Sequence, residues 1–352
     1  MSFRFCVTQP GCEKALKAEV AAMRLPWKFA FSRPGFITFR VDQGRADPLG
    51  VRPSLARVAG ESFGLLEKLS PSVRQALASR AWVGAVFWSR AQEETQPGVW
   101  AGVSATHHQE ELDRLVHGLK FSQGVDGPGE VLHWIEIDPG KVSLGLQLLA
   151  RGEKAYPGGA LNLVLPESAP SRAWLKVEEL VQRERTPIKI GDRVLEVGSS
   201  PGGMSKALLD RGCEVWGVDT GQMHENVLSN SQFHWVQKGV QSLTPSDLGS
   251  GYEWLVVDMN VRPETAVDQI LRVLSFAERS LMGALLTLKV NDERAAEHLP
   301  RLITVLREES GFGKLTRFEA RQLFANRNET AVYFETRKAQ LRRQARLSSG
   351  SI

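Results

Sequence analysis

Two charged residues in the second half of the chain each close a run of apolar residues that predicts a buried strand. They are Asp258 and Lys289. A charge in such a place costs free energy unless it is paired or used. We group with them Lys176, which lies in a predicted helix, and Glu329, which stands just before another predicted strand. Two lysines and two carboxylates could hold and move a proton, although a single such charge is more often a solvated strand end.

The segment 192–204 predicts a buried strand, a tight turn and the start of a helix. Val194, Leu195 and Val197 supply the apolar strand, and Glu196 lies near its carboxyl end. Ligands bind at that end of the strands in open α/β sheets. Glycines allow the backbone to bend and a ligand to come close, and proline suits the first turn of a helix. The turn consists of Gly198, Ser199, Ser200, Pro201, Gly202, Gly203 and Met204.

This turn does not have the spacing of a phosphate-binding site. It lacks the Gly-x-Gly-x-x-Gly pattern of dinucleotide sites and the Gly-Lys-Ser/Thr of a P-loop. The next predicted strand ends in Asp219, about 20 residues after the turn, where an acid can accept hydrogen bonds from ribose hydroxyls. A nucleoside without a phosphate to hold fits S-adenosylmethionine, whereas the alternative is a glycine turn that only packs. The candidate cofactor-binding residues are Glu196, Gly198, Ser200, Pro201, Gly202, Gly203, Met204, Asp219 and Asp258.

The elements around these residues predict two parts of different fold class. From residue 171 onwards, strands and helices alternate and the strands are apolar, which indicates a mostly parallel, doubly covered sheet. The runs 314–324 and 330–337 predict an antiparallel pair at its end. The first half predicts an α+β region in which 131–137 and 142–150 form a hairpin.

We therefore expect an α/β, Rossmann-like domain preceded by an α+β region. The predicted boundaries are an amino-terminal region at 1–155, a linker rich in Gly and Pro at 156–170, the α/β domain at 171–338 and a basic tail at 339–352. The run 337–352 carries five basic residues and no acid, and we expect a solvated helix end and a disordered tail, with phosphate contact as the alternative.

The bulk properties restrict the class of protein. The net charge of +4 permits a nucleic-acid partner without requiring one. Three cysteines without CxxC spacing, and histidines without HExxH spacing, predict neither a disulfide framework nor a metal site. No signal peptide and no apolar run of membrane-spanning length is found, so we expect a cytoplasmic protein.

The run Glu196–Met204 resembles the glycine turn of the FtsJ-like 2′-O-ribose methyltransferases, and nearly the whole chain is similar to their 23S rRNA cytidine methyltransferase M family. Similar segments lie at 169–179, 218–223, 257–259, 288–290 and 320–329, and at 9–14. The resemblance implies a Lys-Asp-Lys-Glu catalytic tetrad at Lys176, Asp258, Lys289 and Glu329. It also implies S-adenosylmethionine as cofactor, a cytidine of the peptidyl-transferase region of 23S ribosomal RNA as substrate, in naked or precursor particles, and an amino-terminal THUMP-type RNA-binding region.

Three positions depart from the family pattern. Glu196 stands where the family has Asp, Met204 where it has an aromatic residue, and the segment 237–239, which includes Lys238, lacks the acid that contacts adenine. The tetrad is intact, and we expect Lys289 to be the general base for a ribose 2′-hydroxyl. An ordinary lysine has a pKa of about 10.4, and we expect burial and Lys176 to lower that of Lys289, with Asp258 and Glu329 limiting the drop.

Two other functions stay open from the sequence. A base methyltransferase of the same fold would carry an Asn/Asp-Pro-Pro-aromatic motif after the fourth strand, where this chain has Asp-Met-Asn-Val at 258–261. A non-catalytic assembly factor that binds ribosomal RNA would keep the fold without turnover, and Lys238 is its only support. Detectable binding of S-adenosylmethionine would count against the assembly factor.

Overall fold

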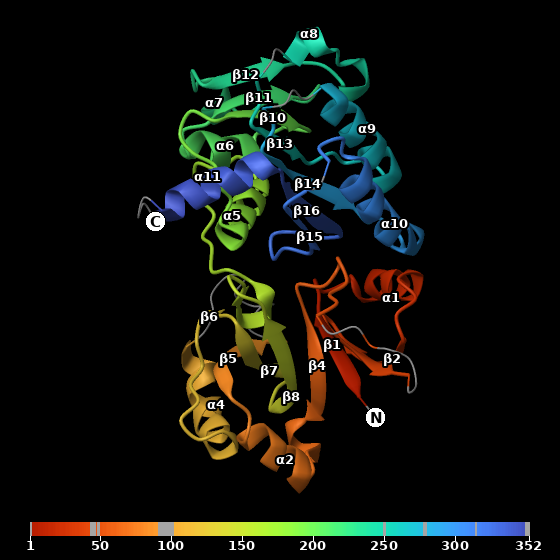
Figure 1. The fold of residues 1–352 in the computed structure, drawn as a ribbon, viewed down its shortest axis with the longest axis vertical. Helices are drawn as coiled ribbons and strands as arrows, with labels where there is room; N and C mark the ends of the chain where they lie inside the picture. Colours follow the sequence, from red (N-terminus) through yellow and green to blue (C-terminus); the bar gives the residue numbers. More distant parts are fainter. Residues whose placement is uncertain are drawn as a thin grey trace. The chain divides into compact units, whose positions relative to one another are not determined.

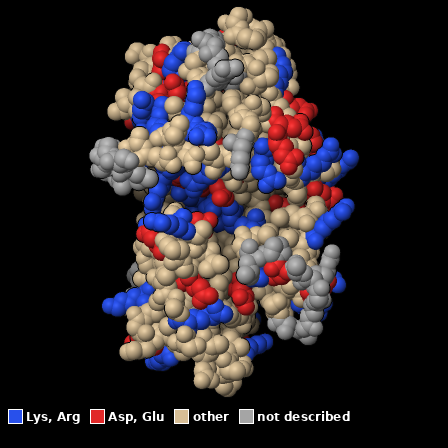
Figure 2. Space-filling model, in the orientation of Figure 1, with Lys and Arg blue, Asp and Glu red and all other residues tan. Residues whose placement is uncertain are grey.

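The structure, a computed structural model, describes residues 2–42, 47, 50–90, 102–248, 251–276, 280–313 and 315–348. The chain forms two compact units, Met1–Asn162 and Leu163–Ile352. Among the described residues, no helix combines the length and the apolar character needed to cross a bilayer. On the face shown in Figure 2, basic and acidic side chains are interspersed over both units, in keeping with a net charge of only +4.

The first unit is built on a mixed sheet in the order β2-β3-β1-β4-β8-β7-β5. Its strands are β1 (Phe3–Val7), β2 (Trp27–Arg33), β3 (Phe36–Val41), β4 (Val58–Leu65), β5 (Trp82–Ser89), β7 (Gly129–Asp138) and β8 (Lys141–Leu149). Only the β5–β7 pair is parallel. The predicted β7–β8 hairpin is confirmed. The strand β2 was not predicted, although Trp27, Phe29 and Phe31 alternate with less apolar residues along it.

Helices and a small second sheet complete this α+β unit. The helices are α1 (Glu13–Ala22), η1 (Leu66–Lys68), α2 (Pro71–Ala78) and α4 (Gly102–Leu115), and β6 (Val125–Asp126) pairs with β9 (Lys154–Ala155). The buried Trp134 packs with Leu112 of α4 and Leu77 of α2 in one core cluster.

The boundary between the units lies within the predicted linker 156–170, but the first residues of that segment are packed in the first unit. The turn η2 (Pro157–Gly159) is buried within the first unit. A Cβ at Gly158 would lie 2.3 Å from Trp88, and one at Gly159 would lie 2.8 Å from the Cβ of Arg57. Gly158 and Gly159 contributed to the prediction of a linker. In the structure these positions require glycine because any side chain would clash with neighbouring residues of the first unit. The second unit begins at residue 163.

The second unit contains a seven-stranded sheet in the order β12-β11-β10-β13-β14-β16-β15. The strands are β10 (Arg193–Val197), β11 (Glu214–Val218), β12 (Phe233–Val236), β13 (Trp254–Val257), β14 (Gly283–Lys289), β15 (Arg317–Arg321) and β16 (Glu329–Glu335). The first five strands in this order are parallel to one another. The strand β16 is antiparallel to β14, and β15 is antiparallel to β16. This confirms the predicted α/β sheet with an antiparallel addition.

Helices lie on both faces of this sheet, as Figure 1 shows for α5, α6 and α11 on one side and α9 and α10 on the other. The helices are α5 (Ala173–Glu184), α6 (Gly203–Asp210), α7 (Glu225–Leu228), α8 (Pro245–Leu248), α9 (Pro263–Phe276), α10 (Glu293–Glu309) and α11 (Arg337–Ser348), with the turn η3 (Val240–Ser242) before α8. The main core cluster joins α5 and α6 to the strands through Val177, Leu208 and Val194.

The sequence predicted a solvated helix end and a disordered tail for the basic run that begins at residue 337. In the structure this run forms the helix α11, which packs against the second unit. Arg342 pairs with the buried Asp192 at 2.5 Å, and Arg343 pairs with the buried Glu335. Arg346 donates to the carbonyl of Ile188 at 2.9 Å. The arginines therefore compensate buried carboxylates and carbonyls inside the protein. Residues 349–352 of the predicted tail lie outside the described residues.

Candidate active site

The second sheet reverses its strand order between β10 and β13, and at such a point an open α/β sheet forms a ligand crevice. Gly198 directly follows β10 with a φ of +82°, and a Cβ there would lie 2.6 Å from the carbonyl oxygen of Asp258. Glycine is required because the turn adopts a left-handed conformation and touches the chain that follows β13. The glycine turn and Asp258 are thereby held side by side.

The rest of the turn leads into α6 and is packed against the start of α5. Gly202 is the N-cap of α6 and has a φ of +109°. Pro201 therefore precedes the helix, whereas the sequence predicted it in the first helical turn. A Cβ at Gly203 would lie 2.1 Å from the hydroxyl of Ser171. The absence of a side chain at Gly203 thus lets the start of α5 approach α6, and α5 carries Lys176.

Asp219, at the end of β11, is turned toward the glycine turn. Its carboxylate accepts hydrogen bonds from the backbone N–H of Ser200 at 3.0 Å and of Gly221 at 2.7 Å. The side chain is partly exposed, and each oxygen keeps a further lone pair. Asp219 is therefore fixed in place and can still accept hydrogen bonds from a ligand's hydroxyl groups.

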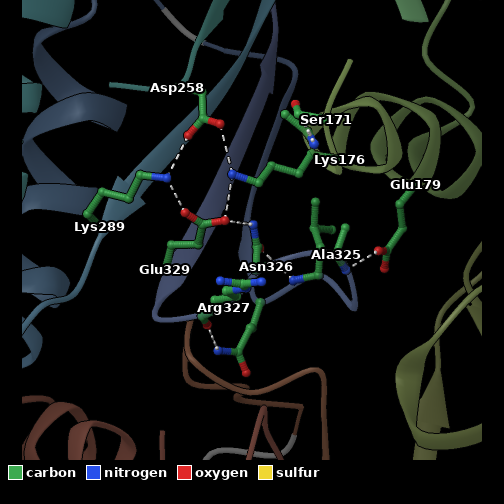
Figure 3. A network of polar contacts seen from close by, with 12 residues as sticks. Ser171, Lys176, Glu179, Asp258, Lys289, Ala325, Asn326, Arg327 and Glu329 are labelled. Carbon is green, nitrogen blue, oxygen red and sulfur yellow. Dashed lines mark hydrogen bonds and ion pairs between the residues drawn. The ribbon is translucent and has the colours of Figure 1, made fainter. Parts of the chain in front are cut away.

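The four charged residues predicted from the sequence meet in one closed ring (Figure 3). The Lys176 Nζ lies 2.8 Å from Asp258 Oδ2 and 2.6 Å from Glu329 Oε1. The Lys289 Nζ lies 2.8 Å from Asp258 Oδ1 and also pairs with Glu329 Oε2. All four side chains are at most 16% exposed. Each lysine therefore bridges both carboxylates, and the ring is electrically neutral when all four groups are charged.

The strand register explains why these residues meet. Lys289 is the last residue of β14 and stands directly opposite Glu329, the first residue of β16, in an antiparallel pair. Side chains directly opposite in such a pair are neighbours on one face of the sheet. Asp258 follows the adjacent strand β13, and Lys176 reaches the ring from α5. Three strand ends and one helix thus supply the ring.

Residues 169–317 match the family described as FtsJ-like methyltransferase. This part of the chain is an FtsJ-like methyltransferase domain. The whole chain is similar to two proteins named ribosomal RNA large subunit methyltransferase M. It is 26% identical to the one from Chromohalobacter salexigens, over 92% of this chain and 95% of that protein, and 27% identical to the one from Alkalilimnicola ehrlichii, over 91% and 92%.

The predicted Rossmann-like methyltransferase fold and the cofactor S-adenosylmethionine are confirmed for the FtsJ-like domain. The groups at the crevice suit this ligand, because carboxylates gather there and the glycine turn contains no lysine for a phosphate. Within the described residues, no cluster of three or more His, Cys, Asp or Glu could hold a metal ion.

Two of the predicted cofactor-binding residues of the FtsJ-like domain lie beneath the turn rather than in the crevice. Glu196 is 1% exposed and accepts a hydrogen bond from the Ser205 hydroxyl at 2.5 Å. Burial raises the pKa of Glu196 to about 8, so most of this carboxyl is protonated at neutral pH. The Met204 side chain belongs to the core cluster. Both side chains support the turn from inside.

The expected lowering of the Lys289 pKa is wrong for this structure. Burial by itself would lower the pKa of Lys289, but the charges of Asp258 and Glu329 and the hydrogen bonds with them outweigh burial and raise it. The same ring lowers the pKa of Glu329, because the effect of its two lysine partners outweighs burial. The sequence could not weigh these effects, since they depend on both carboxylates touching one ammonium.

Lys238, where the family has an acid, does not leave an unpaired positive charge in the FtsJ-like domain. It forms an ion pair with Asp247 of α8, and this pair lowers the pKa of Asp247 to about 2. An acid is thus present near this position, but it comes from a later segment. The pattern of the strand alone could not have revealed it.

Proposed function

We propose that the protein transfers a methyl group from S-adenosylmethionine to the 2′-hydroxyl of a ribose in 23S ribosomal RNA. The observation that carries the proposal is the closed ring of Lys176, Asp258, Lys289 and Glu329 beside the glycine turn. Two lysines and two buried carboxylates can hold and move a proton, and the segment 258–261 lacks the Asn/Asp-Pro-Pro-aromatic motif of a base methyltransferase. The names of the relatives support ribosomal RNA as the substrate.

The turn Gly198–Gly203 and Asp219 would hold the cofactor, and Asp258, a member of the ring, lies next to this turn. The cofactor supplies an activated methyl group on a sulfonium, so the protein need not activate the methyl donor. The remaining task of the residues is to orient a ribose hydroxyl, which is a poor nucleophile, and to accept its proton.

Lys289 is the proposed proton acceptor. Asp258 and Glu329 hold its Nζ from two sides and leave one direction for a hydroxyl, while Lys176 pairs with the other oxygen of each carboxylate. Because its pKa is raised, Lys289 must first lose a proton to solvent before it can take the proton of the 2′-hydroxyl. Only the small deprotonated fraction of the enzyme is then competent at neutral pH.

The rate of methyl transfer is therefore expected to rise with pH. At saturating S-adenosylmethionine, kcat/KM for RNA should increase by about tenfold per pH unit from pH 7 to pH 9, because each unit raises the deprotonated fraction of Lys289 tenfold. Single-turnover rates measured over this range with a short RNA substrate test the prediction. A plateau that begins below pH 8 would mean that the proton acceptor has a much lower pKa than the Lys289 ammonium held in this ring.

We further propose that the first unit is a THUMP-type RNA-binding region and that the target is a cytidine of the peptidyl-transferase region. Its α+β sheet and the family resemblance of the segment 9–14 support the first part. A target that becomes buried in the ribosome would be methylated in naked or precursor RNA, in the cytoplasm. Equal rates on naked RNA and on assembled large subunits would count against this substrate.

Ribose-methylation mapping tests the proposed function. Ribosomal RNA from a strain that lacks the gene is incubated with the purified protein and tritiated cofactor, and alkali-resistant dinucleotides are then mapped. One labelled ribose in 23S RNA is expected. Label on a base would instead indicate a base methyltransferase. Binding of RNA with no detectable binding of S-adenosylmethionine by calorimetry would indicate an assembly factor.

A further inference from the structure

One polar side chain outside the ring contacts the carboxylate of Glu329. The Asn326 Nδ2 donates to Glu329 Oε1 at 3.0 Å, on the same oxygen that Lys176 contacts. Asn326 is 1% exposed, and its Oδ1 accepts the backbone N–H of Leu323 at 2.8 Å. A backbone N–H can only donate, so the oxygen must face Leu323 and the amide nitrogen must face Glu329. Glu329 thus has a neutral donor that cannot release a proton in the relevant pH range.

The loop that carries Asn326 is in turn fixed to α5. The carboxylate of Glu179 accepts the backbone N–H groups of Phe324 and Ala325, both at 3.1 Å. Glu179 is 1% exposed and pairs with Arg183, one turn later in the helix, at 3.1 Å. Figure 3 shows Glu179 reaching the loop at Ala325 while Lys176, from the same helix, reaches the ring.

This arrangement connects the two sides of the ring. Lys176 and Glu179 are three residues apart on α5, and Asn326 and Glu329 are three residues apart at the β15–β16 connection. Contact of Lys176 with Glu329 therefore depends on the loop being held on the helix. Neither Glu179 nor Asn326 touches the proposed path of the methyl group, so any effect they have on catalysis must act through Glu329 and Lys289.

We infer that Asn326 and Glu179 are positioning residues for methyl transfer: Asn326 fixes the carboxylate of Glu329, and Glu179 fixes the loop that carries both. The inference rests on the proposed function. The charged groups that face Glu329 are Lys176 from α5, Lys289 from β14 and, across these lysines, Asp258 after β13. An extra charge at position 326 would add to this set at hydrogen-bond distance from Glu329.

Asn326→Asp is the decisive variant, since it keeps the size of the side chain and replaces the donor by a carboxyl group. Two adjacent carboxyl groups raise the pKa of one of them, and the added negative charge stabilises the ammonium of Lys289 further. We expect kcat at pH 7.5 to fall about tenfold, and the pH at which the rate stops rising to move up by about one unit while the plateau rate is kept. The KM for S-adenosylmethionine should stay within twofold, because the glycine turn is unchanged.

Asn230→Asp is the matched control. Asn230 lies in the turn before β12, and its Oδ1 accepts the N–H of Gln232 at 2.9 Å, a role that aspartate keeps. Its pH profile should coincide with that of the wild type. An unchanged profile and a kcat within twofold for Asn326→Asp would overturn the inference. A residue with only a structural role would lower the melting temperature without moving the profile of the folded enzyme.

Glu179→Gln gives a second, independent readout, which decides the matter if Asn326→Asp does not fold. Glutamine keeps one acceptor oxygen but presents an NH₂ group to the second backbone N–H, so the loop loses one of its two anchors. We expect kcat to fall at least fivefold with an unchanged KM for the cofactor, and an unchanged kcat overturns the inference. Absence of ribose methylation by the wild-type protein would instead refute the proposed function and not the positioning alone.

Discussion

Replacement of Lys289 by alanine is expected to reduce methyl transfer by about 10²- to 10⁴-fold, the range of a lost general base, while S-adenosylmethionine still binds. The variant removes the proposed proton acceptor and leaves Asp258 and Glu329 with Lys176 as their one remaining partner in the ring. The glycine turn and Asp219, which would hold the cofactor, make no contact with the Lys289 ammonium in the ring as described. Single-turnover transfer of tritium to RNA measures the first effect, and calorimetry measures the second.

A matched lysine separates this effect from the general loss of a positive charge. Lys189 is exposed in the turn before β10, at the opposite end of the strand from Gly198. Lys189→Met should transfer methyl groups at the wild-type rate, and Lys289→Met, which keeps the length of the side chain, should be as inactive as Lys289→Ala. Activity of Lys289→Met above a tenth of the wild-type value would contradict the assignment of Lys289 as proton acceptor.

The parts of the fold and site that the sequence predicted are those with a strong local pattern. The apolar strands β13, which Asp258 follows, and β14, which ends in Lys289, were predicted together with the crevice at their ends. Strand ends of a parallel sheet meet at one edge, so Asp258 and Lys289 had to approach each other once the sheet was predicted. The place of Glu329 was harder to derive, because it depends on the antiparallel register of β16 against β14.

The parts that could not be predicted depend on contacts between distant segments. The pKa of Lys289 is set by two carboxylates from different strands, and Asn326 acts on Glu329 only in the folded loop. The glycines at 158 and 159 indicated a linker, but their partners Trp88 and Arg57 are about 70 to 100 residues earlier in the chain. The arginines of α11 looked like a solvated run because the carboxylates that they compensate lie in other elements.

Arg342→Ala is expected to destabilise the second unit by about 3 kcal/mol, the lower end of the range for breaking a buried ion pair. Asp192, 1% exposed, accepts hydrogen bonds from Arg342 at 2.5 Å, from the Trp254 indole at 2.9 Å and from the backbone of Lys189 at 3.0 Å. Without Arg342 the carboxylate stays buried with neutral donors only. Because the Arg342 side chain is 15% exposed, water can replace part of what is lost.

Thermal unfolding of the full chain measures this loss, and the transition that moves upward when S-adenosylmethionine is added belongs to the second unit. For a unit of this size, about 3 kcal/mol corresponds to a fall of roughly 6–12 °C in Tm. Arg337→Ala, at an exposed position at the start of α11, should change the stability by less than about 0.5 kcal/mol. Combining Arg342→Ala with Asp192→Asn should cost less than the sum of the two single changes, since the double variant buries no unpaired charge. Additive effects, or a Tm of Arg342→Ala within about 2 °C of the wild type, would mean that α11 does not neutralise Asp192 in solution.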